Sequence, residues 1–209
     1  MGGYMNIVLA GGGGCMKELL WQFEESGIRV LGYCAPDMEE PTGIISKYKY
    51  LGTDDYLLGL QEDVAVALCF GTPKLRRKVY ETLKSNKYIH FPTIIMEGAK
   101  VSPYAEVGEG TIICKDAVVA TDCKIGNFAF VNMGAHLSHN FILGDFATVS
   151  PRAAIAGNVT VKEDAFIGIN ATIIQGLTVG RGATIGAGAV VTKSVSEGVT
   201  VAGVPAKEI

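Results

Sequence analysis

The chain has 209 residues, of which 48% are hydrophobic and 19% charged, and its net charge is −3. This length and composition fit one or two compact domains and exclude a disordered chain. The basic residues are scattered along the sequence, which argues against a nucleic-acid-binding stripe. No apolar run reaches the length of a membrane span and no signal-peptide pattern opens the chain, so we expect a cytoplasmic protein without membrane insertion.

The cysteines are five in number and contain no C-x-x-C pair: Cys15, Cys34, Cys69, Cys114 and Cys123. An odd number without close pairs predicts neither a disulfide framework nor a zinc site. We therefore expect reduced, buried thiols, as in a cytoplasmic protein.

The first part of the chain, residues 1–92, alternates short apolar runs with amphipathic stretches. We expect three strands and two helices, at 6–10, 29–34, 64–70, about 16–26 and about 73–86. Strands that alternate with helices are typical of a small parallel α/β sheet. The pattern predicts a Rossmann-like domain.

Four glycines, Gly11–Gly14, separate the first predicted strand from the first predicted helix. Bare N–H groups at a helix N-terminus attract anions, so this loop suits a phosphate. The loop departs from the dinucleotide fingerprint, because Met16 stands where the third glycine belongs and no acidic residue ends the second strand. Two interpretations remain: a truncated nucleotide pocket, or a tight turn that only packing requires.

An internal repeat begins at Ile95, where an aliphatic residue starts to recur at every sixth position through seventeen consecutive hexads. A period of six excludes an α-helix and differs from strand alternation, so each hexad must contain a short strand and a corner. The fourth place of the hexad is Gly, Asn or Asp in twelve of the seventeen, and these residues tolerate the positive φ of a sharp corner. Three faces of six residues predict coils of eighteen, with the aliphatic residues inside. Burial of each one stabilises the fold by roughly 1.5–3 kcal/mol.

This repeat predicts a parallel β-helix at 93–209. The tail at 199–207 breaks the period, and we expect it to close the last coil, because the open end of a repeat array must be capped.

The chain has three histidines, His90, His136 and His139. We expect His90, at the domain junction, to be structural. His136 and His139 have no third histidine near them in the β-helix, which disfavours a metal site and an activity of the γ-type carbonic anhydrases. His139 occupies the third place of its hexad, where side chains project outward, and its residue type suits a surface position or a general base at neutral pH.

The hexad repeat resembles the left-handed β-helix of the hexapeptide-repeat family, a likeness that implies left-handed coiling and a homotrimer. The stretch Val131–Phe146 (VNMGAHLSHNFILGDF) closely resembles the active-site coil of bacterial sugar acetyltransferases. These are the sialic acid O-acetyltransferases and nucleotide-amino-sugar N-acetyltransferases of the NeuD/PglD-like family. The closing residues Gly203–Lys207 (GVPAK) and the small α/β domain extend the likeness over nearly the whole chain.

The resemblance implies an enzyme that transfers an acetyl group from acetyl-CoA, without a metal, to the amine of a nucleotide-linked amino-deoxy sugar. It implies that His139 is the general base in a direct transfer. Asn140 stands where relatives often carry an acidic residue. Two interpretations remain: Asn140 is a plain corner residue, or Asp122, one coil below, substitutes for the missing negative charge. Gly157, eighteen residues after His139, is our candidate for the backbone N–H that stabilises the oxyanion.

By the same resemblance, the acetyl-CoA contacts map to Thr148, Ile169 and Ala187, and the nucleotide-sugar contacts map to Gly13, Gly14, Cys15, Ala35, Pro36 and Gly71. Ile169 and Ala187 share a phase of the repeat that differs from the phase of His139, so we expect them at another corner. A site that uses both corners requires a neighbouring subunit, in agreement with the implied homotrimer. The alternatives are sugar O-acetylation and a non-catalytic trimeric scaffold.

Overall fold

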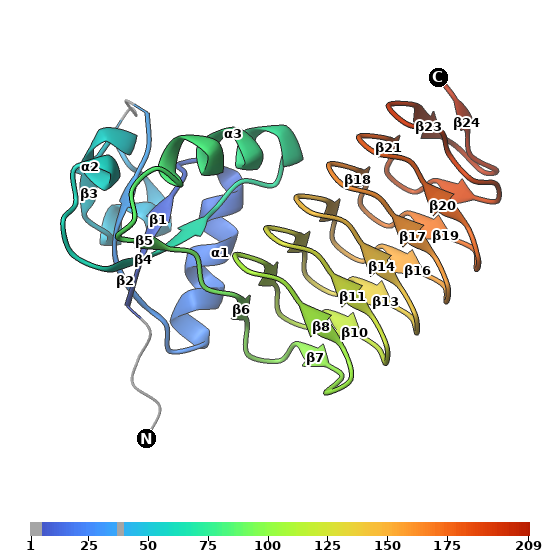
Figure 1. Ribbon diagram of the computed structural model, residues 1–209, viewed down its shortest axis with the longest axis horizontal. Helices are drawn as coiled ribbons and strands as arrows, with labels where there is room; N and C mark the ends of the chain where they lie inside the picture. The colour runs from blue at the N-terminus through green and yellow to red at the C-terminus, as the bar shows by residue number, and fades with distance from the viewer. Residues whose placement is uncertain (1–5, 37–39) are drawn as a thin grey trace. The chain divides into compact units, whose positions relative to one another are not determined.

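The computed structural model describes residues 6–36 and 40–209 (Figure 1). Contacts divide the chain into two units, residues 1–71 with 75–92 and residues 72–74 with 93–209. We call the first the α/β unit and the second the rod. No helix among the described residues combines the length and the apolar character that crossing a membrane requires.

The α/β unit alternates strands and helices. Its elements are β1 (Asn6–Ala10), α1 (Gly14–Glu25), β2 (Arg29–Cys34), the 3-10 helix η1 (Gly43–Lys47), β3 (Tyr50–Gly52), α2 (Asp54–Leu58), β4 (Val64–Leu68), α3 (Pro73–Leu83) and β5 (Ile89–His90). The strands form one parallel sheet in the order β3-β2-β1-β4-β5, which agrees with the predicted α/β architecture.

The strands β1 and β2 have the predicted bounds, whereas β3 and α2 were missed because each is too short to show a period. The central strand β1 is buried from Ile7 to Ala10, since β2 and β4 pair with both of its edges. Helix α1 buries residues at helical spacing, among them Met16, Leu20 and Phe23. It begins at Gly14, two residues earlier than predicted, so the helix starts within the glycine loop itself.

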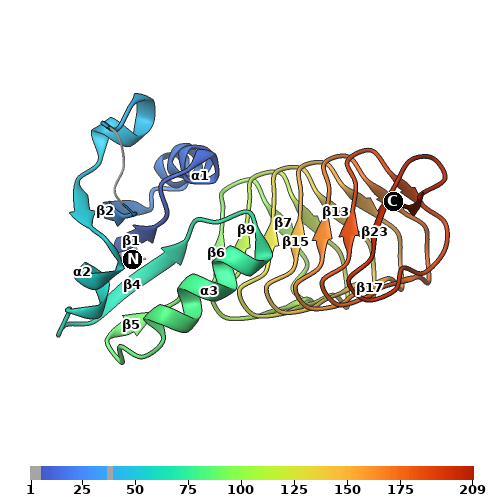
Figure 2. The ribbon, with the colours of Figure 1, turned by 90° about the horizontal axis from the view of Figure 1, so that it is seen from above.

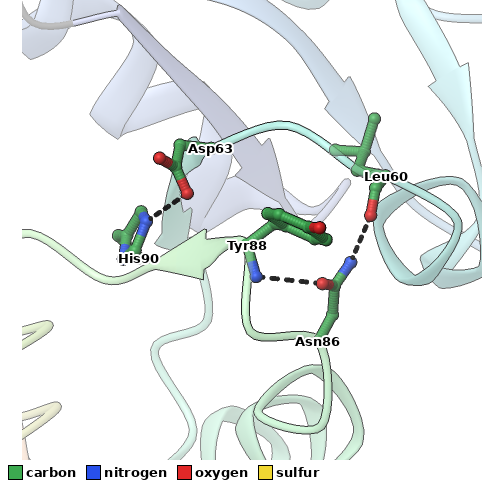
Figure 3. Close-up of polar contacts among 5 residues, drawn as sticks. All are labelled: Leu60, Asp63, Asn86, Tyr88 and His90. Atoms are coloured by element: carbon green, nitrogen blue, oxygen red, sulfur yellow. Dashed lines mark hydrogen bonds and ion pairs between the residues drawn. The ribbon is translucent and has the colours of Figure 1, made fainter.

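The turn between α3 and β5 is held by the side chain of Asn86 (Figure 3). Its Nδ2 donates hydrogen bonds to the carbonyl oxygens of Leu57 at 2.9 Å and Leu60 at 3.0 Å. Its Oδ1 accepts from the N–H of Tyr88 at 3.0 Å. The amide thus ties the end of α2 and the residues after it to the start of β5.

From β6 to β22 the rod consists of two-residue strands that begin at every sixth residue, and its strands form three sheets (Figures 1 and 2). Sheet I contains β6 (Ile94–Ile95), β9 (Ile112–Ile113), β12 (Phe130–Val131), β15 (Thr148–Val149), β18 (Phe166–Ile167), β21 (Thr184–Ile185), β23 (Thr200–Ala202) and β24 (Lys207–Glu208). Sheet II contains β7 (Lys100–Val101), β10 (Val118–Val119), β13 (His136–Leu137), β16 (Ala154–Ile155), β19 (Thr172–Ile173) and β22 (Val190–Val191). Sheet III contains β8 (Glu106–Val107), β11 (Lys124–Ile125), β14 (Ile142–Leu143), β17 (Thr160–Val161) and β20 (Thr178–Val179).

From β6 to β22 each strand pairs with the strand eighteen residues away, as His136 pairs with Ala154, which confirms the predicted coil length. From Ile113 to Val191 the predicted inward residues are at most 4% exposed. The prediction was wrong for the first hexad, where Ile95 is 47% exposed and Ile94 is buried instead. Because β6 is the terminal strand of sheet I, no earlier coil supplies a surface on which Ile95 could pack.

The corners adopt the predicted left-handed backbone. The fourth place of the hexad has a positive φ in fifteen of the seventeen hexads, all except those of Tyr104 and Ser194. Three of these residues, Phe128, Phe146 and Arg152, have φ values of 53–59° although their side chains disfavour this region. The strand pairing on both sides of each corner therefore imposes the turn even where the residue type does not favour it.

The tail ends the repeat as predicted. Strand β23 pairs with β21 at an offset of sixteen residues, Thr184 with Thr200, and β24 returns antiparallel to β23. An antiparallel pair turns the chain back, so the coil cannot continue beyond it.

Candidate active site

The predicted nucleotide-sugar contacts gather at one edge of the α/β sheet. Strands β1, β2 and β4 are adjacent and parallel, so their carboxyl ends lie side by side. The strand order reverses at β1, and open α/β sheets bind ligands at such a switch point. The six predicted residues all follow these strand ends within five positions: Gly13, Gly14, Cys15, Ala35, Pro36 and Gly71.

The glycines of this edge have two different roles. Gly11 has a φ of 142°, and a Cβ there would lie 3.0 Å from the carbonyl oxygen of Cys69, so close packing requires this glycine. A Cβ on Gly13, Gly14 or Gly71 would meet nothing within 4 Å. The tight-turn interpretation therefore explains Gly11, whereas the other three glycines border open space that a ligand can occupy.

The N-terminus of α1 is open toward this space. Gly13 is the N-cap residue, no side chain caps the helix, and its first turn contains no acidic residue. Uncapped N–H groups at a helix N-terminus attract anions. In the same turn, burial raises the pKa of the Cys15 thiol to about 11, although the Arg76 guanidinium opposes this effect. The thiol is therefore neutral at physiological pH and does not repel a phosphate.

The imidazole of His139 extends from the corner between sheets II and III over the next coil. An ideal Cβ on Gly157 would lie 2.4 Å from both Nε2 and Cε1 of His139. The ring therefore occupies the space that any side chain at Gly157 would fill. The N–H of Asn158 donates to the His139 carbonyl oxygen at 3.1 Å, which fixes the two corners against each other.

Asn140 contributes both backbone and side chain to this corner. Its φ of 57° makes the turn, and its Oδ1 lies 2.9 Å from Nδ1 of His139. Because an amide oxygen only accepts, Nδ1 carries the ring proton and the lone pair stays on Nε2, which is the tautomer that a base needs. No hydrogen bond or ion pair joins Asp122 to His139 among the residues that the structure describes.

The backbone of Gly157 has one unused hydrogen-bonding group. Its carbonyl oxygen accepts from the N–H of Gly176 at 3.1 Å, but in the described part of the chain its own N–H has no acceptor. Gly157 is buried, and its N–H, like that of His139 and Gln175 in the same column, lies outside the hydrogen-bond ladder that joins the coils. The N–H is thus available to stabilise an oxyanion next to the His139 ring.

The predicted acetyl-CoA contacts lie elsewhere on the rod. Ile169 and Ala187 lie at successive corners between sheets I and II, and both are exposed. Thr148, on β15 of sheet I, is buried. As the phase of the repeat predicts, His139 belongs to a different edge of the three-sided rod, between sheets II and III.

Sheet II carries a groove of about 400 Å³ that sequence reasoning missed. It is lined by residues that include His136, Ser138, Ala154, Ile174 and Gln175. The small side chain of Ala154 in β16 leaves a gap between bulkier residues of the neighbouring coils. The repeat contained a signal for this groove. Residues eighteen apart occupy the same outward column, so a small residue between larger ones in that column predicts a gap.

The remaining histidines lie outside this corner. His90 Nε2 lies 2.9 Å from Asp63 Oδ1, a contact within the α/β unit that agrees with a structural role (Figure 3). His136 is exposed on β13. Within residues 6–36 and 40–209, no group of three or more His, Cys, Asp or Glu side chains is arranged to hold a metal ion.

The rod's repeat has a counterpart among known protein families. The model of the family described as bacterial transferase hexapeptide (six repeats) matches residues 158–193. The acetyltransferase domain of PglB from Neisseria gonorrhoeae FA1090, solved in complex with acetyl coenzyme A, is 30% identical. The alignment covers 99% of this chain and 100% of that one, with a TM-score of 0.89. The chain belongs to the hexapeptide-repeat sugar acetyltransferase family.

Two further solved structures resemble this acetyltransferase over the whole chain. PerB from Caulobacter crescentus, in complex with CoA and GDP-perosamine, is 30% identical, with coverages of 98% and 97% and a TM-score of 0.85. WeeI from Acinetobacter baumannii AYE is 28% identical, with coverages of 98% and 100% and a TM-score of 0.77. A comparison with curated proteins gave no match. The predicted fold of the acetyltransferase, a left-handed β-helix preceded by a Rossmann-like domain, is thereby confirmed.

Proposed function

We propose that this acetyltransferase moves the acetyl group of acetyl-CoA directly onto the amine of a nucleotide-linked amino-deoxy sugar, within a ternary complex. The observation that carries the proposal is the His139 imidazole, which lies over Gly157 and has its Nδ1 held by Asn140. A similar protein, the GDP-perosamine N-acetyl transferase of C. crescentus, was solved in a mutant form with CoA and GDP-perosamine. A sugar of this class would be used in surface-polysaccharide or glycan assembly.

The residues of the corner divide the chemistry among them. His139 Nε2 accepts a proton from the acceptor amine as the amine nitrogen attacks the thioester carbonyl carbon. The Gly157 N–H donates to the carbonyl oxygen as negative charge develops there. When the C–S bond breaks, the protonated His139 ring returns its proton to the leaving thiolate. Asn140 accepts from the Nδ1–H in both protonation states of the ring, so the neutral ring before and after the transfer is the required tautomer.

The carboxyl edge of the α/β sheet would bind the nucleotide part of the acceptor. The N-terminus of α1, with Gly13 and Gly14, offers N–H groups to the diphosphate. Cys15 would contribute its backbone N–H, because its thiol is neutral. Ala35, Pro36 and Gly71 would border the rest of the nucleotide sugar.

We further propose a homotrimer with active sites between neighbouring rods. One three-sided rod holds His139 at one edge of sheet II, and Ile169 and Ala187 at the other. A second copy could bring its edge with Ile169 and Ala187 to the His139 of the first. Ile174, which directly follows β19 of sheet II and lines the groove there, is 42% exposed, and an exposed apolar side chain suits association with a second copy.

We place the reaction in the cytoplasm. All five cysteines lie within the described residues and none is in a disulfide, and four of them are buried. Free thiols persist in a reducing compartment.

The proposal is tested by thiol release from acetyl-CoA with a panel of acceptors: UDP-, GDP- and dTDP-linked amino sugars, and free sialic acid. We expect turnover with at least one nucleotide-linked amine. The variant His139→Ala should lose roughly 10²–10⁴-fold in turnover and keep its oligomeric state. The control His90→Ala, whose ring contacts Asp63 in the α/β unit, should keep full activity.

Three outcomes would contradict the proposal. Undiminished turnover of His139→Ala would show that His139 is not the general base. Transfer to free sialic acid alone would indicate O-acetylation. No thiol release with any acceptor would indicate a scaffold.

A further inference from the structure

The corner between sheets II and III repeats one outward position per coil. The third places of its hexads form a column of six residues: Pro103, Thr121, His139, Gly157, Gln175 and Lys193. Gly157 is the one glycine of this column, so the His139 ring can lie over its backbone from one side, and Gln175 follows it on the other side. Strands of neighbouring coils lie about 4.8 Å apart, so about 10 Å separates the backbones of His139 and Gln175.

We propose that Gln175 is a further catalytic residue, whose side-chain amide donates the second hydrogen bond to the oxyanion beside the Gly157 N–H. This inference rests on the acetyl transfer proposed above. Oxyanion sites commonly combine a backbone N–H with a second donor, and a glutamine amide is one of the groups that serve. A glutamine also suits a position near the base, because it donates a hydrogen bond without titrating or carrying a charge.

The position of Gln175 relative to the Gly157 N–H is set by the backbone. The next residue, Gly176, donates its N–H to the Gly157 carbonyl oxygen at 3.1 Å and turns the chain with a φ of 75°. The two corners are therefore held one coil apart, a distance that the three-carbon stem of a glutamine side chain can span.

The side chain of Gln175 is free to make this contact. Gln175 is exposed, and within the described residues no hydrogen bond of its side-chain amide is found. It lines the groove on sheet II together with His136 and Ser138, from the coil that carries the base. An amide held at the wall of a groove beside the base is placed to meet a ligand.

The proposed step balances without a further reactant. The amine nitrogen forms a bond to the carbonyl carbon, and the electron pair of the C=O π bond moves to the oxygen. The N–H of Gly157 and the amide of Gln175 both donate to that oxygen. The electron pair returns as the C–S bond breaks, and the His139 ring carries the proton from the amine to the thiolate.

The test compares Gln175→Ala and Gln175→Glu with the matched control Lys193→Ala, which lies one coil further along the same column. Loss of one oxyanion donor lowers kcat by about 10²–10³-fold, and we expect a loss of at least 10²-fold in both glutamine variants. The KM values for acetyl-CoA and the acceptor should change less than about threefold, because the oxyanion exists only in the transition state. Lys193→Ala should retain the wild-type kcat.

A structural role for Gln175 would give a different result, namely raised KM values or a lower Tm with kcat unchanged. That result, or a kcat of Gln175→Ala within about twofold of the wild type, would overturn the inference while leaving the acetyl transfer intact. A wild type that releases no thiol with any acceptor would overturn the proposed function and this inference together.

Discussion

The contact between His139 and Gly157 leads to a quantitative prediction for the variant Gly157→Ala. The φ of Gly157 lies outside the left-handed region, so alanine can adopt the same backbone, and the N–H remains in place. The new Cβ would lie 2.4 Å from Nε2 and Cε1 of the His139 ring. Carbon atoms pack at about 3.5–4.0 Å, so the ring must move by about 1.1–1.6 Å.

This displacement should affect catalysis much more than stability. The imidazole is the far end of an exposed side chain, so it can rotate away at little cost in the free energy of unfolding. A misplacement of about 1 Å in a reacting group can cost about 10²-fold in rate. We therefore expect Gly157→Ala to lower kcat by about 10²-fold and to shift the Tm by no more than a few degrees.

A double-mutant cycle separates this mechanism from others. Steady-state thiol release is measured for the wild type, Gly157→Ala, His139→Ala and the double variant, and thermal melts are recorded for all four. If the alanine acts only by displacing the ring, it should cost nothing further once His139 is absent. Full activity of Gly157→Ala would refute the position of the His139 ring over Gly157. An equal loss with and without His139 would refute the argument that the effect passes through the ring.

Further predictions concern other parts of the molecule. Asn140→Gly should lower kcat at least tenfold without lowering the Tm, because glycine accepts the φ of 57° but offers no hydrogen-bond acceptor to His139. Asn140→Asp, which keeps an acceptor, should stay active. Equal kinetics of the two variants would argue against the role of Asn140 in fixing the His139 tautomer. The pKa of Cys15 is raised from 9.0 to about 11, so its alkylation at pH 8 should be about 100-fold slower than that of an ordinary thiol. The alkylation rate, followed by mass spectrometry, should rise about tenfold per pH unit up to pH 11. A rate that does not change with pH would contradict the raised pKa. Ile174→Glu, directly after β19 of sheet II, should give monomers in size-exclusion chromatography with light scattering. The control Thr160→Glu on sheet III should remain a trimer. A trimer in both variants would mean that the subunit interface does not include Ile174. Gly13→Val should raise the KM for the nucleotide sugar with an unchanged circular dichroism spectrum, because the added side chain would enter space that the protein leaves open. An unchanged KM would mean that the nucleotide sugar does not bind next to Gly13.

Much of the rod could be predicted from the sequence because its fold depends on a local, repeated choice. Each hexad needs one aliphatic residue inside and one residue that tolerates a corner, and seventeen repetitions make the period unambiguous. The exceptions arise where a neighbour decides instead. Ile95 is exposed because no earlier coil packs against it, and Phe128 adopts a positive φ because its neighbours hold the turn.

The α/β unit was less predictable, because its short elements carry no period. Strand β3 and helix α2 have three and five residues, too few to distinguish them from loops. Their positions are decided by pairing with β2 and by capping from Asn86, contacts that join residues far apart in the chain.

The sequence by itself determined the coil length, the corners, the column that joins His139 to Gly157, and the separate corner on which Ile169 and Ala187 lie. All of these follow from counting residues along a regular repeat. Only the tertiary structure decided that the imidazole lies over Gly157, that Asn140 orients it, and that Gly13 borders open space while Gly11 packs against Cys69. Those facts depend on side-chain rotation and on distances of a few ångströms between atoms of different segments, which no pattern of residue types specifies.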